Sequence, residues 1–162
     1  MYITYNDYNQ LYDPIEGRVF NLLAFDACRM MDIHTTGIDN VKKLQKYFPT
    51  DEYSARAVRH CAAKIVNFLN QIRDAEMTTA AERGYTETAQ GLQRRIISRI
   101  EAGNEAISYS EAKTGTTYID AAVADKVVRD KIVAEIIWEN LSGVEDANGV
   151  NLLFMGRYPR RY

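Results

Sequence analysis

The sequence has 162 residues, of which 46% are hydrophobic and 26% are charged. A chain of this length forms one domain and buries enough apolar surface to fold without disulfides or metals. These fractions exclude disordered and fibrous classes. Lys and Arg number 20 and Asp and Glu number 22, a balance that argues against broad nucleic-acid binding. The 11 Tyr residues, beside 5 Phe and 1 Trp, are unusual and favour partly hydrated contacts.

Cysteine use and the first residues bear on the compartment. Cys28 and Cys61 lie in apolar, helix-like runs, and two cysteines do not build a disulfide framework. We expect both to be buried thiols in a reducing compartment. Residues 1–12 lack the basic-then-apolar pattern of a signal peptide, and no apolar run approaches the ~18 residues of a membrane span. The sequence predicts a soluble, intracellular protein.

Helix signals dominate the first half of the chain. Thr4 is placed to cap a short helix that reaches Leu11. Asp13-Pro14-Ile15-Glu16 predicts the start of a second helix, which would continue to about Ile33. A short amphipathic turn follows and ends at Pro49. The apolar face of the second helix consists of Phe20, Leu23, Ala27, Met30 and Met31, and that of the turn of Val41, Leu44 and Phe48.

The longest predicted helix begins at Thr50-Asp51-Glu52 and ends at about Ala81, before Gly84. Apolar residues recur on it every three or four positions and form one continuous stripe. A weaker helical pattern covers 86–100. The stripe consists of Val58, Ala62, Ile65, Leu69 and Ile72, and is widened by Cys61, Val66 and Phe68.

Residues 103–119 differ in character, because β-branched and aromatic residues replace the helical pattern. They predict a short β-hairpin or extended arm. Asp120 would then cap a last helix from Ala121 to Leu141, with two adjacent apolar stripes. The stripes are Val123, Val127, Ala134, Ile137 and Leu141, and Val128, Ile132 and Ile136.

The predicted fold is therefore mainly α: a small helical bundle with a short arm before the last helix and an extended C-terminal tail. It forms a single domain over 1–162, with a helical core over 1–149, an arm at about 103–119 and an extended segment over 150–162.

The sequence contains no recognisable catalytic or metal-binding motif. It has no phosphate-binding glycine loop and no nucleophile elbow. His60 and Cys61 are adjacent, so on a helix their side chains diverge, and His34 follows Cys28 by an unfavourable spacing. We expect no enzyme activity, no cofactor and no metal.

Two charged segments remain. The acids of the last helix form either a solvated face or a wall that repels a polyanion. Residues 157–162 carry three arginines, and no acid follows Asp146. They follow a strongly apolar run near the terminus, which suggests packing or strand addition to a neighbouring subunit. The acids are Asp120, Asp125, Asp130, Glu135 and Glu139, and the tail residues are Val150, Leu152, Leu153, Phe154, Met155, Arg157, Tyr158, Arg160, Arg161 and Tyr162.

Four segments in order resemble the small head–tail connector (head-completion, adaptor) proteins of tailed bacteriophages. They are the opening MYITYNDY (1–8), the helix beginning near Pro14 with its Phe20 and Ala27 face, the segment ISYSEAKTGTTY (107–118) and the ending LLFMGR (152–157). Two features depart from the family pattern. Met155 stands where a basic residue is common, and 79–103 is longer than the usual link.

The resemblance implies a structural virion protein at the neck, made in the host bacterial cytoplasm. It would form a homo-oligomeric ring, commonly a dodecamer, between the portal protein and the next neck or tail-completion protein, and DNA would pass through the lumen without specific binding. It implies that 150–162 contacts the portal and that the helix acids face the lumen. It assigns the inter-subunit arm to Ile107, Tyr109, Thr116 and Tyr118.

Other classes stay open at this stage. They are a small helical DNA-binding or regulatory protein, an unrecognised enzyme and an interaction domain of unknown partner. The charge balance counts against the first of these and the lack of a polar constellation against the second. Eight of the eleven tyrosines lie outside the predicted helical core, where we expect partner contacts. They are Tyr2, Tyr5, Tyr8, Tyr12, Tyr109, Tyr118, Tyr158 and Tyr162.

Overall fold

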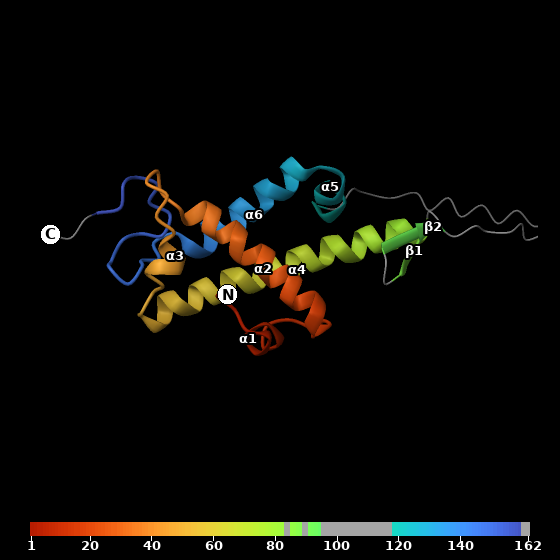
Figure 1. The fold of residues 1–162 in the computed structure, drawn as a ribbon, viewed down its shortest axis with the longest axis horizontal. Coiled ribbons are helices and arrows are strands. Elements are labelled where there is room, and N and C mark those ends of the chain that lie inside the picture. Colours follow the sequence, from red (N-terminus) through yellow and green to blue (C-terminus); the bar gives the residue numbers. More distant parts are fainter. Residues whose placement is uncertain (83–84, 89–90, 95–117, 160–162) are drawn as a thin grey trace, which may run out of the picture.

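The computed structural model describes residues 1–82, 85–88, 91–94 and 118–159, and this part of the chain is mainly α-helical (Figure 1). The elements are α1 (Tyr5–Asn9), α2 (Gly17–Thr35), α3 (Lys43–Lys46), α4 (Glu52–Glu82), β1 (Tyr85–Thr88), β2 (Gly91–Arg94), α5 (Tyr118–Ala124) and α6 (Lys126–Leu141).

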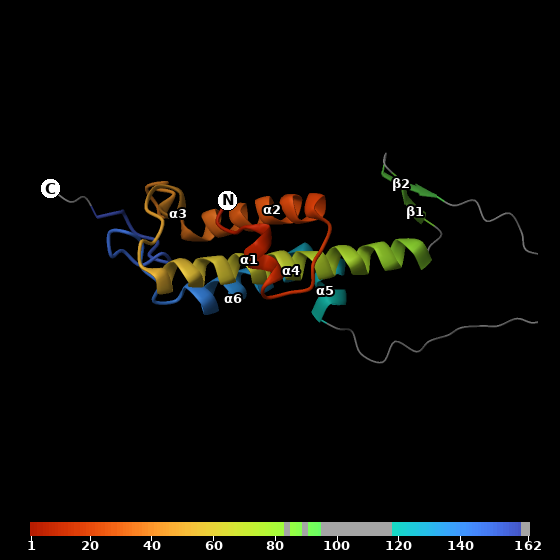
Figure 2. The same ribbon diagram turned by 90° about the horizontal axis from the view of Figure 1, so that it is seen from below.

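The long helix α4 is the spine of the bundle. Figure 2 shows it between α2 on one side and α6 on the other. All eight residues of its predicted stripe are buried, which confirms that prediction. Burying one such side chain contributes about 1.5–3 kcal/mol. Because the apolar arc is wider than a single seam, one helix can serve both neighbours.

The start of the chain follows its sequence signals closely. Thr4 caps α1 together with Asp7, each side chain pairing with the other residue's backbone N–H, in a capping box. The predicted start of α2 at Pro14 is wrong, because the helix begins at Gly17. The Tyr5 hydroxyl donates to the Ile15 carbonyl at 2.6 Å, and this contact occupies a carbonyl that would otherwise accept a hydrogen bond within the helix.

The last predicted helix is in fact two helices. Asp125 has an extended backbone, separates α5 from α6, and accepts a hydrogen bond from the Val127 N–H at 2.8 Å as the N-cap of α6. Asp120, the predicted cap, instead lies in the first turn of α5. The break also alters the predicted stripe: Ile137 and Leu141 are buried, whereas Val127 is 74% exposed.

The predicted helical pattern at 86–100 is wrong where the structure describes it. β1 and β2 pair antiparallel there, with Tyr85 opposite Arg94 and Thr88 opposite Gly91. The arm predicted at 103–119 lies outside the described residues as far as 117. Its final residues belong to α5, where the Tyr118 ring stacks on Phe68 and its hydroxyl donates to Gln71.

Both ends of the described chain reach the core. Tyr8, from α1, and Leu152, from the C-terminal segment, are fully buried in the cluster that α2, α4 and α6 build. No helix of the described residues combines the length and apolarity that crossing a membrane requires.

Candidate functional site

The C-terminal segment, residues 150–159, folds back onto its own domain. Figure 1 shows its blue trace beside α3, at one end of the bundle. Leu152 is fully buried and Leu153 packs against the core. The prediction of an extended tail is therefore wrong for this part of the segment. Its apolar side chains complete the core of their own subunit, which removes the cost of exposing them to water.

Lys43 of α3 fastens this segment. Lys43 is fully buried, and its ammonium donates to the carbonyl oxygens of Asn151 (3.4 Å), Leu152 (2.9 Å) and Phe154. The three donors of a lysine thus meet three acceptors. Desolvation by burial lowers the pKa of Lys43, and the charges of Asp146 and Asp39 oppose that shift.

Asp146 organises the loop that leads into the segment. One carboxylate oxygen accepts from the backbone N–H groups of Asn148 (2.8 Å) and Val150 (3.0 Å), and the other accepts from the Tyr158 hydroxyl at 2.5 Å. The Tyr158 backbone N–H also donates to Asp39 at 2.7 Å. Its ring stacks on Tyr47 with centroids 4.8 Å apart. These contacts bind the segment to the α2–α3 loop at a second place.

Gly37 allows the α2–α3 loop and the C-terminal segment to approach each other closely. The Ile38 N–H donates to the Met155 carbonyl at 3.0 Å. A Cβ atom on Gly37 would lie 2.6 Å from the carbonyl oxygen of Gly156, closer than any real contact of this kind. The absence of a side chain at position 37 is therefore a condition of this docking.

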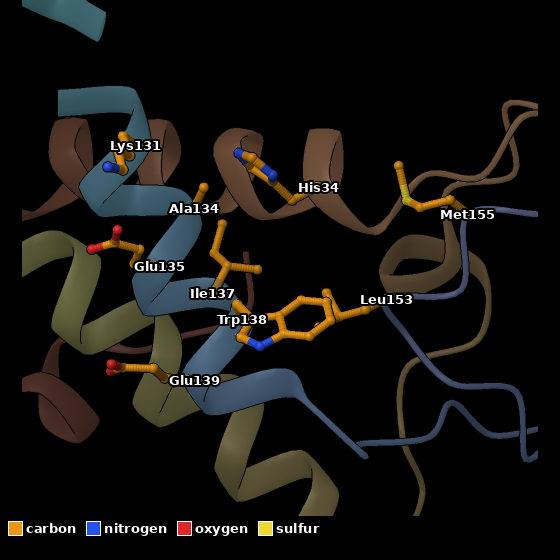
Figure 3. A pocket seen from close by; sticks show the side chains of 9 residues that line it. All are labelled: His34, Lys131, Ala134, Glu135, Ile137, Trp138, Glu139, Leu153 and Met155. Carbon is orange, nitrogen blue, oxygen red and sulfur yellow. The ribbon is translucent and has the colours of Figure 1, made fainter. Parts of the chain in front are cut away.

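A groove lies between α2, α6 and this segment (Figure 3), with a volume of about 540 Å³. We call it the Trp138 groove. The Trp138 indole, 65% exposed, lies toward Leu153 and Met155, while the carboxylates of Glu135 and Glu139 point away from them. The groove is lined by His34, Lys131, Ala134, Glu135, Ile137, Trp138, Glu139, Leu153 and Met155.

The outer face of α2 adds to the apolar surface. Leu22, Phe25 and Ile33 are exposed and recur at helical spacing opposite the buried face. Ile33 also borders a second hollow between α2 and α6, which shares His34 with the Trp138 groove. Exposed apolar side chains gathered on one helix face are a feature of many contact sites between proteins.

The five predicted lumen acids do not lie on one line. Asp120 belongs to α5 and Asp125 caps α6. Asp130 borders the second hollow, near Arg29 and Lys126, while Glu135 and Glu139 border the Trp138 groove. Apart from the half-buried Asp120, these acids are exposed.

The N-terminal tyrosines have intramolecular roles. Tyr8 packs on Phe20 and Tyr12, and the Tyr2 hydroxyl donates to Asp32 at 2.5 Å. Burial raises the pKa of Tyr2, Tyr8 and Tyr12. The expectation that these residues serve partners is therefore not supported by their positions, because they hold α1 on the bundle.

Both cysteines are buried and free, as predicted, and burial raises the pKa of Cys61 to about 12. Among the described residues, no group of three or more His, Cys, Asp or Glu side chains is arranged to hold a metal ion.

Sequence reasoning missed the two residues that organise this region. Lys43 carries no motif, and its acceptors lie more than a hundred residues away. Trp138 left a signal, because it belongs to neither apolar stripe of the last helix and so projects outward. Ile107, Tyr109 and Thr116 lie outside the described residues.

Comparison of the chain with protein-family models, with curated proteins and with solved structures gives no match.

Proposed function

We propose that this chain is a structural, non-enzymatic subunit of a tailed-phage neck, which assembles as an adaptor ring between the portal protein and the next neck or tail protein. The observation that carries the proposal is the apolar surface that a single subunit leaves in water. It includes Phe25 and Ile33 of α2 and Trp138 of α6. The order of the four segments that resemble connector proteins supplies the kind of assembly.

Fewer residues are available for the proposed portal contact than the segment 150–162 contains. Leu152 is buried in the core of its own subunit, and Tyr158 is bound to Asp39 and Tyr47 of the same subunit. Phe154 and Arg157 keep exposed side chains, so we assign the portal contact to them. Residues 150–153 and 158 would position these side chains through their contacts within the subunit.

DNA passage through the ring requires a lumen that does not retain the polyanion. We propose that Asp125 and Asp130 face this lumen, since both carboxylates are exposed. Glu135 and Glu139 border the Trp138 groove, so they are not assigned to the lumen.

The test measures assembly by light scattering after size exclusion, for the full chain alone and mixed with a portal ring. We expect a closed oligomer that co-elutes with the portal. Deleting 150–162 would remove Leu152 from the core, so the better variant is Phe154→Ser with Arg157→Ser. It should lose portal binding and keep its helical content.

The matched control is Leu11→Ser with Arg18→Ser, one exposed apolar and one exposed basic residue far along the chain from this segment. It should bind the portal like the wild type. A subunit that stays monomeric and ignores the portal would refute the proposed function. Sequence-independent binding to duplex DNA would favour the DNA-binding alternative.

A further inference from the structure

The chemistry of the Trp138 groove defines what it can bind. An open indole face attracts a cation or a second aromatic ring. Glu135 and Glu139 lie one helical turn apart on the same helix and border the groove with two exposed carboxylates. Leu153 and Met155 supply an apolar wall opposite (Figure 3). A segment that combines arginines with an aromatic residue satisfies all three features, because the planar guanidinium both pairs with carboxylates and stacks on aromatic rings.

The same chain carries such a segment. Residues 159–162 read PRRY, with two arginines, one tyrosine and no acid. They follow Tyr158, which is bound to Asp39, Asp146 and Tyr47 of its own subunit.

We propose that the Trp138 groove of one subunit binds residues 159–162 of a second copy of this chain, and this inference rests on the ring proposed above. The groove and the segment are different surfaces of one molecule. A contact between them is therefore heterologous, and heterologous contacts close into rings when the rotation allows. Opposite charge on the two surfaces favours this pairing over contact of two grooves.

The single tryptophan of the chain makes the groove directly observable. Emission of Trp138 in the full-length protein is recorded over a dilution series, with light scattering on the same samples. We expect the emission to shift as subunits associate, and to shift back in high salt because exposed charge pairs are screened.

Charge reversal identifies the partners. Glu135→Lys with Glu139→Lys should weaken association by at least about tenfold, because like charges then face each other. Arg160→Glu with Arg161→Glu should weaken it similarly. The four changes together should restore association and the concentration-dependent emission. The control is Asp13→Lys with Glu16→Lys, the same change in charge at exposed positions of the chain away from the groove.

Three results would overturn the inference. The first is assembly detected by scattering while Trp138 emission stays constant. The contact between subunits would then lie outside the Trp138 groove, and the proposed ring would not be affected. The second is an emission change in Arg160→Glu with Arg161→Glu that does not depend on concentration, which assigns the groove to the chain's own tail. The third is failure of the four-fold variant to recover. Conversely, a restored groove contact in a protein that never binds the portal supports the inference and refutes the proposed function.

Discussion

The ammonium nitrogen of Lys43 lies 2.9 Å from the carbonyl oxygen of Leu152, 109 residues further along the chain. This contact joins the shortest helix to the C-terminal segment and replaces water around a buried charge with fixed backbone dipoles. A buried ammonium is costly unless all its donors are satisfied. Here three carbonyl groups from one turn of chain satisfy them.

Removing this charge should loosen the segment. Lys43→Met keeps the length of the side chain but leaves three carbonyl groups without their donor. We expect the free energy of unfolding to fall by about 1–3 kcal/mol, the cost of unsatisfied buried polar groups. Urea denaturation measures the loss, and hydrogen exchange should show faster exchange at residues 151–155. Lys46→Met, an exposed change in the same helix, is the control. Equal stability of the two variants would contradict the role given to Lys43.

The close approach at Gly37 gives a second prediction. Gly37→Ala should force the backbone at Gly156 to move, because the new Cβ would meet its carbonyl oxygen at 2.6 Å. We expect a loss of about 1–3 kcal/mol, typical of overpacking, and faster exchange of the Ile38 amide. Gly17→Ala is the matched control, since nothing lies within 4 Å of its Cβ position. An Ile38 amide that stays fully protected in Gly37→Ala would rule out the proposed clash.

Alkaline pH should release the segment from its second anchor. Burial and the hydrogen bond to Asp146 raise the pKa of Tyr158 to about 12, above its ordinary value of 10.0. The folded state therefore holds this proton more tightly than the unfolded state. Its contribution to stability is complete below pH 10 and is lost as the pH rises from 10 to about 12.

The comparison of wild type with Tyr158→Phe isolates this effect, because the other tyrosines with raised pKa values titrate in both proteins. The variant should be less stable at pH 8, and the difference should shrink toward pH 12. Urea midpoints over this range measure it, with Tyr53→Phe at an exposed position as the control. A difference that is constant with pH would show that the phenol proton is not responsible.

The break between α5 and α6 should depend on its cap. Asp125→Ala removes the acceptor of the Val127 N–H and should lower stability by about 0.5–2 kcal/mol. Thermal unfolding followed by circular dichroism measures this loss, and the Val127 amide should exchange faster. Asp130→Ala removes an exposed acid from within α6 and should cost less. If both variants unfold together with the wild type, the cap does not stabilise the break.

Local signals in the sequence were sufficient for most helices. The Thr4 cap, the long stripe on α4 and the buried face of α2 all depend on residues within a turn or two of each other. Periodicity reports them because the spacing of a helix is fixed by its own backbone. The errors fell at junctions: the start of α2 is displaced by the contact of Tyr5 with Ile15, and Asp125 divides a pattern that looked continuous.

The sequence alone determined that the described part of this protein is mainly helical, with buried cysteines and a long apolar stripe on α4, because these properties follow from composition and period. Only the tertiary structure decided where the end of the chain lies. The apolar run at 150–155 could pack on its own core or on a neighbour, and no local pattern separates these outcomes. The choice depends on Lys43, Gly37 and Asp39, which approach the segment only after the chain has folded. The near-balanced net charge of −2 likewise carried little information until the fold placed Glu135 and Glu139 at the border of the Trp138 groove.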